Sequence, residues 1–362
     1  MSKTDLAIVT MSYGTNYGNK LQNYAMQVVY ESMGFSVETI KLKPAISYSS
    51  TLKEKLNNIG SKILKRLKCK IYKSYINKRR ENFEEFNAKH INFTLKEFDM
   101  NSYSELNDEK YQIYSVGSDQ VWNSYFDEFS GVYLLDCLDN SKIRISYAAS
   151  LGCETINPIY EDKFENELNK FKAISVREDE GKKVLEDSYG LPVEVVVDPT
   201  LLLEKKEWDR LIENSKFKEN NKYVLTYFLG EMGSKLKKYI TCYARKNELK
   251  IIHLNRMSTQ YYSAGPVEFV DMIKNAHMIF TDSFHACCFS IIYEKPFWVV
   301  SRNSVKKNMN SRINTLLKNL KLETRWWNEN VDVESIPDFQ TAYINLNELK
   351  RNSYKFLEKS IV

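Results

Sequence analysis

The chain has 362 residues and a formal net charge of +5, and 43% of its residues are hydrophobic and 13% aromatic. This composition excludes an intrinsically disordered chain, and the length predicts two domains. No apolar run typical of a signal peptide begins the chain, and no run of about 18 apolar residues predicts a membrane span, so we expect a cytoplasmic or peripheral protein. The cysteines form no CxxC pair, which favours reduced thiols over a disulfide or a zinc site.

Short apolar, β-branched runs recur in two series along the chain, each followed by a polar turn and often by a helical pattern. The first series predicts strands at 6–11, 113–116, 143–148, 173–176 and 193–197. The second predicts strands at 223–228, 251–254, 278–281 and 297–300, with helices at 233–248, 266–276 and 285–294. Strand–helix alternation in two series predicts an α/β fold of two doubly wound, Rossmann-like domains that face a cleft.

The domain boundaries follow from the same pattern. We expect an N-terminal domain at 1–200 with a basic helical insert at about 50–90, a second domain at 201–340, and a C-terminal helix at 341–362. Ligands of such folds lie beyond the carboxyl ends of the strands, which predicts a site in the cleft between the domains.

The segment 52–80 is strongly basic, with eleven lysines and arginines and a single acid, Glu54. Its apolar residues recur near helical spacing, which predicts an amphipathic helix or a pair of helices. Two interpretations remain open: a solvated helix that packs by one face, and a helix attracted to anionic lipid at the inner face of a membrane. No nucleic-acid-binding motif accompanies the charge, so nucleic acid is not an expected partner.

The stretch "GTNYGNK" leads from the first predicted strand into a helix. It lacks the spacing of a nucleotide phosphate loop, so a nucleotide site is not predicted from it. The amide side chains of Asn16, Asn19 and Gln22 can both donate to and accept from sugar hydroxyls, and we expect them to face the cleft. A glycine turn capped by Asn16 or Asn19 is the structural alternative.

The stretch "VGSDQVWN" repeats this arrangement after the strand at 113–116. Ser118, Asp119 and Gln120 should point into the cleft, where an aspartate can accept a proton from a substrate hydroxyl or orient it. Helix capping by Ser118 or Asp119 explains the same residues without a function.

Two further strand ends carry ionisable groups. Arg177 follows the strand at 173–176, and its planar guanidinium suits a carboxylate or a phosphate, although an ion pair with a neighbouring acid is an alternative. His285 follows the strand at 278–281 and the polar residues Asp282 and Ser283, where an imidazole can exchange protons near neutral pH. A satisfied core or capping histidine is the alternative at this position.

Seven of these stretches together resemble the polysaccharide pyruvyl transferase family. They run in family order across roughly residues 7–300: "NYGNKLQNYAMQ", "VGSDQVWN", "SYAASLG", "ISVRE", "VVDPTLLL", "GPVEFVDMIKNA" and "TDSFHACCFSIIYEKPF". The resemblance implies a two-domain fold similar to that of GT-B glycosyltransferases. It also implies transfer of pyruvate from phosphoenolpyruvate to two hydroxyls of a sugar in a surface-polysaccharide precursor, which forms a cyclic ketal, with no metal or redox cofactor.

The chemistry that this reaction would need lets us assign roles to particular residues. His285 would be the catalytic acid, with Asp119 as a second catalytic group. Family members carry Arg-Leu-His where this chain has Ser283, Phe284 and His285, as in an Asp-Ser-Phe-His branch, so the family arginine is missing. The donor would then be bound by residues at several strand and helix ends: Arg177, Arg312, Ser283 and Ser311. Capping by Ser311 or Asn310 would place Arg312 at the positive end of a helix and let it replace the missing cation.

The acceptor would be a glycan, in our reading a lipid-linked one, bound by Asn16, Asn19, Gln22, Ser118 and Gln120. Two other classes of function remain open. A glycosyltransferase of GT-B type would use a nucleotide sugar, and an acid that binds the nucleoside near the end of the second domain would indicate it; the sequence "KKNMNSRI" is cationic instead. A non-catalytic member of a polysaccharide assembly complex would explain the missing arginine.

Overall fold

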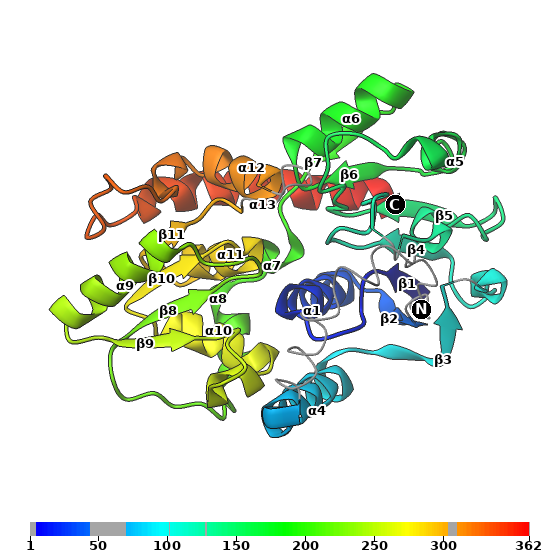
Figure 1. Ribbon diagram of the computed structural model, residues 1–362. Coiled ribbons are helices and arrows are strands. Elements are labelled where there is room, and N and C mark those ends of the chain that lie inside the picture. The colour runs from blue at the N-terminus through cyan, green and yellow to red at the C-terminus, as the bar shows by residue number, and fades with distance from the viewer. Residues whose placement is uncertain (1–4, 44–69, 101, 127–128, 303–309, 362) are drawn as a thin grey trace, which may run out of the picture.

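The computed structural model describes residues 5–43, 70–100, 102–126, 129–302 and 310–361 (Figure 1). Its first sheet has five parallel strands in the order β3-β2-β1-β4-β5. They are β1 (Asp5–Val9), β2 (Ser36–Lys43), β3 (Phe93–Asp99), β4 (Ile113–Val116) and β5 (Ile143–Ser146). A parallel pair, β6 (Ile174–Val176) and β7 (Val193–Val195), continues this sheet through bridges from β5 and the residues after it.

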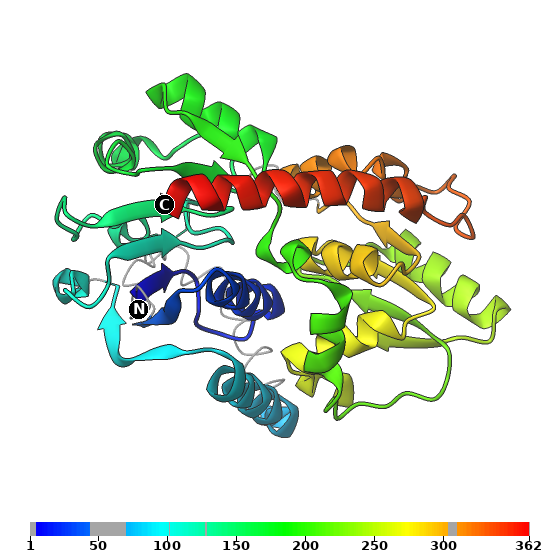
Figure 2. The ribbon, with the colours of Figure 1, turned by 180° about the vertical axis from the view of Figure 1, so that it is seen from behind.

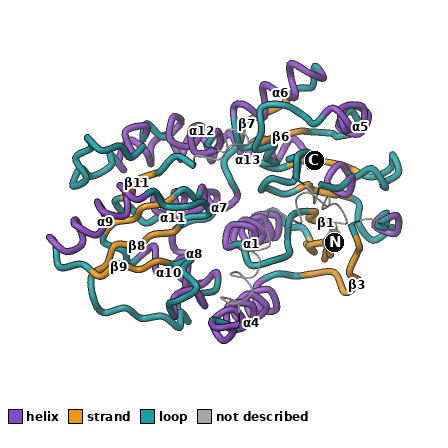
Figure 3. The backbone as a smooth tube through the Cα atoms, in the orientation of Figure 1, coloured by secondary structure: helices purple, strands orange, loops and turns teal. Residues whose placement is uncertain are grey.

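The second sheet is also parallel, in the order β11-β10-β8-β9. Its strands are β8 (Tyr223–Tyr227), β9 (Lys250–His253), β10 (Met278–Thr281) and β11 (Phe297–Val299). The predicted α/β class with two Rossmann-like halves is confirmed, and the tube in Figure 3 shows the two groups of strands separated by helices.

Helices cover both sheets and connect them. The α-helices are α1 (Tyr17–Ser32), α4 (Lys73–His90), α5 (Glu161–Leu168), α6 (Asp179–Tyr189), α7 (Pro199–Leu202), α8 (Lys205–Ile212), α9 (Ser234–Lys246), α10 (Pro266–Lys274), α11 (Phe284–Ile292), α12 (Ser311–Asn319) and α13 (Phe339–Ile361). Short 3₁₀ turns lie at η1 (Ser104–Leu106), η2 (Gly131–Leu134), η3 (Pro158–Tyr160), η4 (Gln260–Ser263) and η5 (Glu323–Arg325).

The chain crosses between the halves twice. After β7 it passes through α7 and α8 into the C-terminal half, and α13 later runs back along both halves, as the rear view shows (Figure 2). In the N-terminal half, the Val197 N–H donates to Ser353 Oγ of α13 at 3.1 Å, and the Tyr147 and Phe356 rings lie 6.4 Å apart. The connection between the two sheets thus runs through α7, and α13 ties the two halves together on one side.

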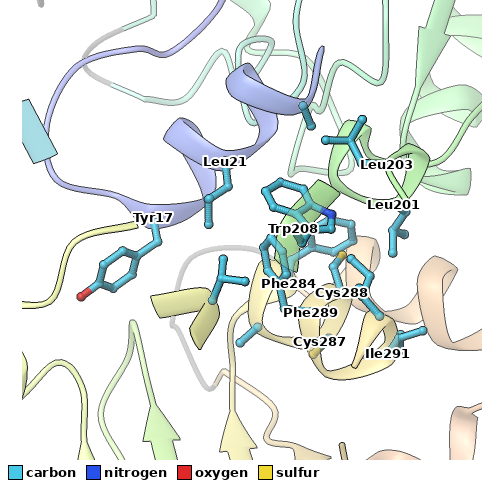
Figure 4. Packing of buried hydrophobic residues seen from close by; sticks show 14 of the residues in the cluster. Tyr17, Leu21, Leu201, Leu203, Trp208, Phe284, Cys287, Cys288, Phe289 and Ile291 are labelled. Atoms are coloured by element: carbon cyan, nitrogen blue, oxygen red, sulfur yellow. The ribbon is translucent and has the colours of Figure 1, made fainter. Parts of the chain in front are cut away.

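A continuous apolar core fills the contact between the halves (Figure 4). Tyr17 of α1 is fully buried, and its ring stacks on Phe269 of α10 with 4.4 Å between the ring centroids. Trp208 of α8 lies edge-on to Phe289 of α11 at 4.8 Å. Because large aromatic side chains from both halves share this core, much of the contact between the domains is packed and dry rather than an open cleft.

Helix α4 braces the two halves on another side. The Arg79 guanidinium donates to Tyr17 Oη at 2.6 Å and to the carbonyl oxygens of Thr15 and Tyr262, both at 3.0 Å. It also lies 4.5 Å from the centre of the Tyr17 ring, a cation–π contact. Asn82 adds a hydrogen bond of 2.7 Å to the Ser263 carbonyl oxygen. The end of the basic segment is thus a structural connection to the C-terminal half.

Two further expectations concern the basic segment 52–80 and the absence of a membrane span. Residues 52–69 of the basic segment lie outside the described residues, and 70–80 form the beginning of α4 and the residues before it. In the described part of the chain, no helix combines the length and the apolar character that a membrane crossing needs.

Candidate functional site

An ion-pair network lies where β4, β6 and β7 end. Arg177 is fully buried, and its guanidinium donates to Asp198 Oδ2 at 2.8 Å and to Asp119 Oδ1 at 3.1 Å. Ser118 Oγ donates to the same Asp198 oxygen at 2.7 Å. The other Asp198 oxygen accepts from the backbone N–H and the hydroxyl of Thr200, because Asp198 also caps α7. The alternative of an ion pair at Arg177 is therefore the arrangement that the structure shows.

The pKa directions agree with this pairing. Burial by itself raises the pKa of Asp198, but His285 and Arg177 outweigh it and hold that pKa well below its usual range. The pKa of Asp119 is likewise lowered, because Arg177 and His285 outweigh its burial. An ionised aspartate that is hydrogen-bonded to an arginine is a weak base. Asp119 is thus better placed to orient a hydroxyl than to take its proton.

His285 joins this network from the C-terminal half. It is buried in the first turn of α11, with Nε2 3.6 Å from Asp198 Oδ2 and no hydrogen-bond partner for that nitrogen among the described residues. Its ring lies against Gly18 in α1, where a Cβ would stand 2.0 Å from Nδ1. Gly18 is therefore required for the close approach of the two halves at this histidine.

Arg312 is the second ionisable residue that the C-terminal half brings to this contact. It lies in the first turn of α12 and is buried, and no hydrogen bond or ion pair to it is found within the described ranges 5–302 and 310–361 with their gaps. Burial and the neighbouring Arg177 lower the pKa of Arg312 to about 10, so it remains charged at neutral pH. A buried, unpaired cation at a helix N-terminus is a site that favours an anion.

The predicted residues after β4 lie in or beside this network. Asp119 has a positive φ of 80°, a backbone conformation that costs free energy in a residue other than glycine and is often found at functional sites. Gln120 is buried and packs against Gly152, and its amide nitrogen has no partner in the described part of the chain. Ser118 and Asp119 are thus brought together with Arg177 and His285, as expected for one site.

The predicted amides of α1 have different surroundings. Asn16 is exposed, and its side chain accepts from the Gly18 N–H at 2.9 Å, which caps α1. Gln22 is fully buried and donates to Thr10 Oγ1 of its own half and to the Asn19 carbonyl. Asn19 is buried, and its Oδ1 has no hydrogen-bond partner within the described part of the chain. The contacts of Gln22 argue against the predicted acceptor contact there, because its amide is used within the N-terminal half.

The residues around His285 and Arg312 also differ from expectation. The Asp282 carboxylate accepts from the N–H groups of Leu229 and Gly230 and from Arg302 Nε, so it orders the loop after β8 rather than His285. Ser283 caps α11 through the Ala286 N–H, at 3.5 Å. Ser311 is buried in the first turn of α12, and neither it nor Asn310 makes a side-chain cap there; that part of the prediction is wrong.

Three residues of the network were not selected from the sequence. Asp198 lies at its centre, Phe284 lies under Arg177 at 4.7 Å from the guanidinium carbon, and Gly18 lies against the histidine. The signal for Asp198 was available, because an Asp-Pro pair directly follows the apolar run 193–197, at a strand end. Contacts such as that of Gly18 with His285 depend on how the two halves pack, which no local pattern indicates.

Two parallel α/β halves with buried arginines and a histidine at their contact define a two-domain, GT-B-like architecture. The chain belongs to the polysaccharide pyruvyl transferase family, whose profile matches residues 16–304. A comparison with curated proteins gave no significant match. The family assignment expected from the seven sequence stretches is confirmed, and with it a transferase that acts on a polysaccharide acceptor.

Solved structures show the likeness of the fold. A protein assigned as a UDP-N-acetylglucosamine 2-epimerase from Listeria monocytogenes superposes with a TM-score of 0.52 at 10% identity, over 100% of this chain and 92% of that one. UDP-GlcNAc 2-epimerase from Neisseria meningitidis gives a TM-score of 0.47 at 12% identity, over 99% and 94% of the two chains. At 10% identity, the similarity to the Listeria protein shows a shared fold and nothing about function.

Proposed function

We propose that this protein transfers the pyruvate carbons of phosphoenolpyruvate to two hydroxyls of one sugar in a surface-polysaccharide precursor. The observation that carries the proposal is Arg312 at the start of α12, which is buried and has no partner among the residues that the structure describes. A donor with a carboxylate and a phosphate supplies the anion that this cation lacks. Arg312 thereby takes the place of the arginine that is missing before His285, whereas Arg177 is occupied by two aspartates.

The reaction divides among the residues of the network as follows. His285 gives a proton to the methylene carbon of the donor, and the neighbouring carbon becomes electrophilic. The oxygen of a sugar hydroxyl bonds to that carbon, the carbon–oxygen bond to phosphate breaks, and a second hydroxyl closes the ring. The products are the cyclic ketal and inorganic phosphate: of the two protons that the hydroxyls lose, one returns to His285 and the other goes to the phosphate. Ser118, Asp119 and Gln120 would orient the hydroxyls, and no metal or redox cofactor enters the proposal.

The proposal includes a lipid-linked acceptor met at the inner face of a membrane. The support is the charge of segment 52–80, since each cation near an anionic surface contributes on the order of 1 kcal/mol. Arg79 is not available for this role, because it is buried between the halves. Flotation with anionic and neutral vesicles at low and high salt would test it, and equal flotation with both would rule out the electrostatic attachment.

Replacing Arg312 by methionine is expected to weaken phosphoenolpyruvate binding about 10–100-fold, the usual loss for a hydrogen bond to a charged group. The reason is that methionine keeps much of the packing but removes the cation. Isothermal titration calorimetry of the variant and the wild type measures the effect. Lys318→Met on the same helix is the matched control, because Lys318 is exposed and pairs with Asp179.

The same calorimetry separates the two enzyme classes. Binding of phosphoenolpyruvate without binding of UDP or GDP supports pyruvyl transfer. Binding of a nucleoside diphosphate alone would instead support a glycosyltransferase that uses a nucleotide sugar. Equal phosphoenolpyruvate binding by wild type and Arg312→Met would remove Arg312 as the donor-binding cation.

A further inference from the structure

A pocket with charged side chains in its wall lies in the N-terminal half, beside the start of α1. It has a volume of about 800 Å³ and lies between the β1–α1 loop, the ends of β2 and β3, and α4. This volume is in the range of small-molecule sites. Figure 1 shows α4 beside β3 and below α1. Residues 12–15, which line the pocket, follow β1, so the pocket lies beyond the carboxyl end of that strand. None of the residues proposed above for the donor or the acceptor lines it.

The polar floor of this pocket is the ammonium group of Lys20. Lys20 is 1% exposed, and its Nζ donates to the Ser12 carbonyl oxygen. No carboxylate of the described residues forms an ion pair with it, and burial lowers its pKa to about 8. A buried ammonium group without a counter-charge costs folding free energy, so its retention points to an anion that binds there.

The walls of the pocket suit a sugar that carries this anion. Arg80 of α4 and Lys41 of β2 add positive charge at the exposed rim, where Lys41 also lies 3.7 Å from Glu97. The Phe83 and Tyr13 side chains provide apolar surface for the faces of a sugar ring. Glu84, Asn87 and Thr94 supply oxygen and nitrogen atoms for sugar hydroxyls.

The pocket is linked to the proposed reaction centre by one turn of helix. Gly18 lies against His285, and Lys20, two residues further along α1, faces the pocket. The α4 wall of the pocket is also held against the C-terminal half. Arg79 of α4 donates a hydrogen bond to that half, and its neighbour Arg80 lines the pocket. A ligand held by Lys20 would therefore lie beside the first turn of α1 that packs on His285.

We propose that this pocket is a subsite for a phosphorylated sugar of the acceptor, with the phosphate on Lys20 and Arg80. That the bound sugar belongs to the acceptor rests on the proposed function. The binding of an anionic sugar in this pocket does not. The same chemistry could come from a hexuronic acid, whose carboxylate would bind Lys20 in place of the phosphate. Both are anionic sugars, and the test separates them.

The test measures binding without the donor. Hexose 1-phosphates, the corresponding neutral hexoses and hexuronic acids are titrated calorimetrically into wild type and Lys20→Met at low salt. We expect at least one hexose 1-phosphate to bind wild type more tightly than its hexose, and Lys20→Met to lose about tenfold or more. Lys89→Met is the control, since Lys89 is exposed on α4 and pairs with Glu85.

The remaining results of this binding test also support or overturn the proposed subsite. If Lys20→Met does not fold, Arg80→Met, whose side chain is exposed, serves as the second variant and should weaken the same complex. Tighter binding of a hexuronic acid would assign the site to a carboxylate. No preference of wild type for any anionic sugar, or an unchanged affinity in both variants, would overturn the proposal. Phosphoenolpyruvate binding that survives Lys20→Met would show that the donor site is separate, so the two proposals can fail independently.

Discussion

Replacing His285 by glutamine is expected to lower turnover about 10²–10⁴-fold, the usual contribution of a general acid. Glutamine keeps polar atoms near the position of the ring nitrogens but cannot carry the proton that the donor's methylene carbon needs. Release of phosphate from phosphoenolpyruvate, with a panel of glycan acceptors, measures turnover. Donor affinity should change much less, because the donor's anion is proposed to bind Arg312, which lies in a different helix.

The control for this variant is His277→Gln. His277 is exposed and precedes β10, whereas His285 follows the opposite end of the same strand, so the two changes are chemically matched. Thermal unfolding of both variants shows whether the fold is kept. Wild-type turnover in a folded His285→Gln enzyme would mean that another group protonates the donor, and the mechanism proposed here would be wrong.

Replacing Arg177 by methionine is expected to lower the free energy of unfolding by about 3–5 kcal/mol, because Asp119 and Asp198 would then be buried without their counter-charge. Urea unfolding at pH 7 measures this loss. Arg210→Met is the control: its pair with Glu207 is exposed, and the change should cost less than about 1 kcal/mol.

The pH dependence of that loss follows from the direction of the carboxyl pKa values. In the wild type the pKa values of Asp119 and Asp198 are lowered, so the stability that they contribute is present above about pH 4 and is lost at lower pH. Without Arg177 the same carboxyls protonate more readily, and the difference between variant and wild type should shrink as the pH falls toward 4. A stable Arg177→Met protein with weakened donor binding would instead restore the donor-binding role expected from the sequence.

The sequence predicted the class of fold because its central strands are continuous apolar runs. Two strands were missed, β2 and β3, because each mixes polar and apolar residues: β2 alternates them in "SVETIKLK", and β3 forms the edge of the sheet with Leu95 fully exposed. Local patterns of this kind have a period of two and little hydrophobicity, so a search for buried runs does not find them.

The candidate site was predicted in part for a similar reason. Strand ends identify which side chains can meet, and Asp119, Arg177 and His285 do lie in one network. The position of a charged residue at a strand end does not show which group pairs with it. Arg177 is neutralised by Asp198 whereas Arg312 is left without a partner among the described residues, and this difference depends on packing between segments far apart in the chain.

The apolar core shared by the two halves has a consequence for biosynthesis. The buried face of α1, with Tyr17 and Leu21, finds its partners in α7, α10 and α11, which a ribosome adds well over a hundred residues later. Until then a nascent N-terminal half exposes this aromatic face, and an exposed apolar surface of this kind binds chaperones or promotes aggregation. The halves are therefore poor candidates for separate expression, and evolution by exchange of one half would have to preserve both faces together.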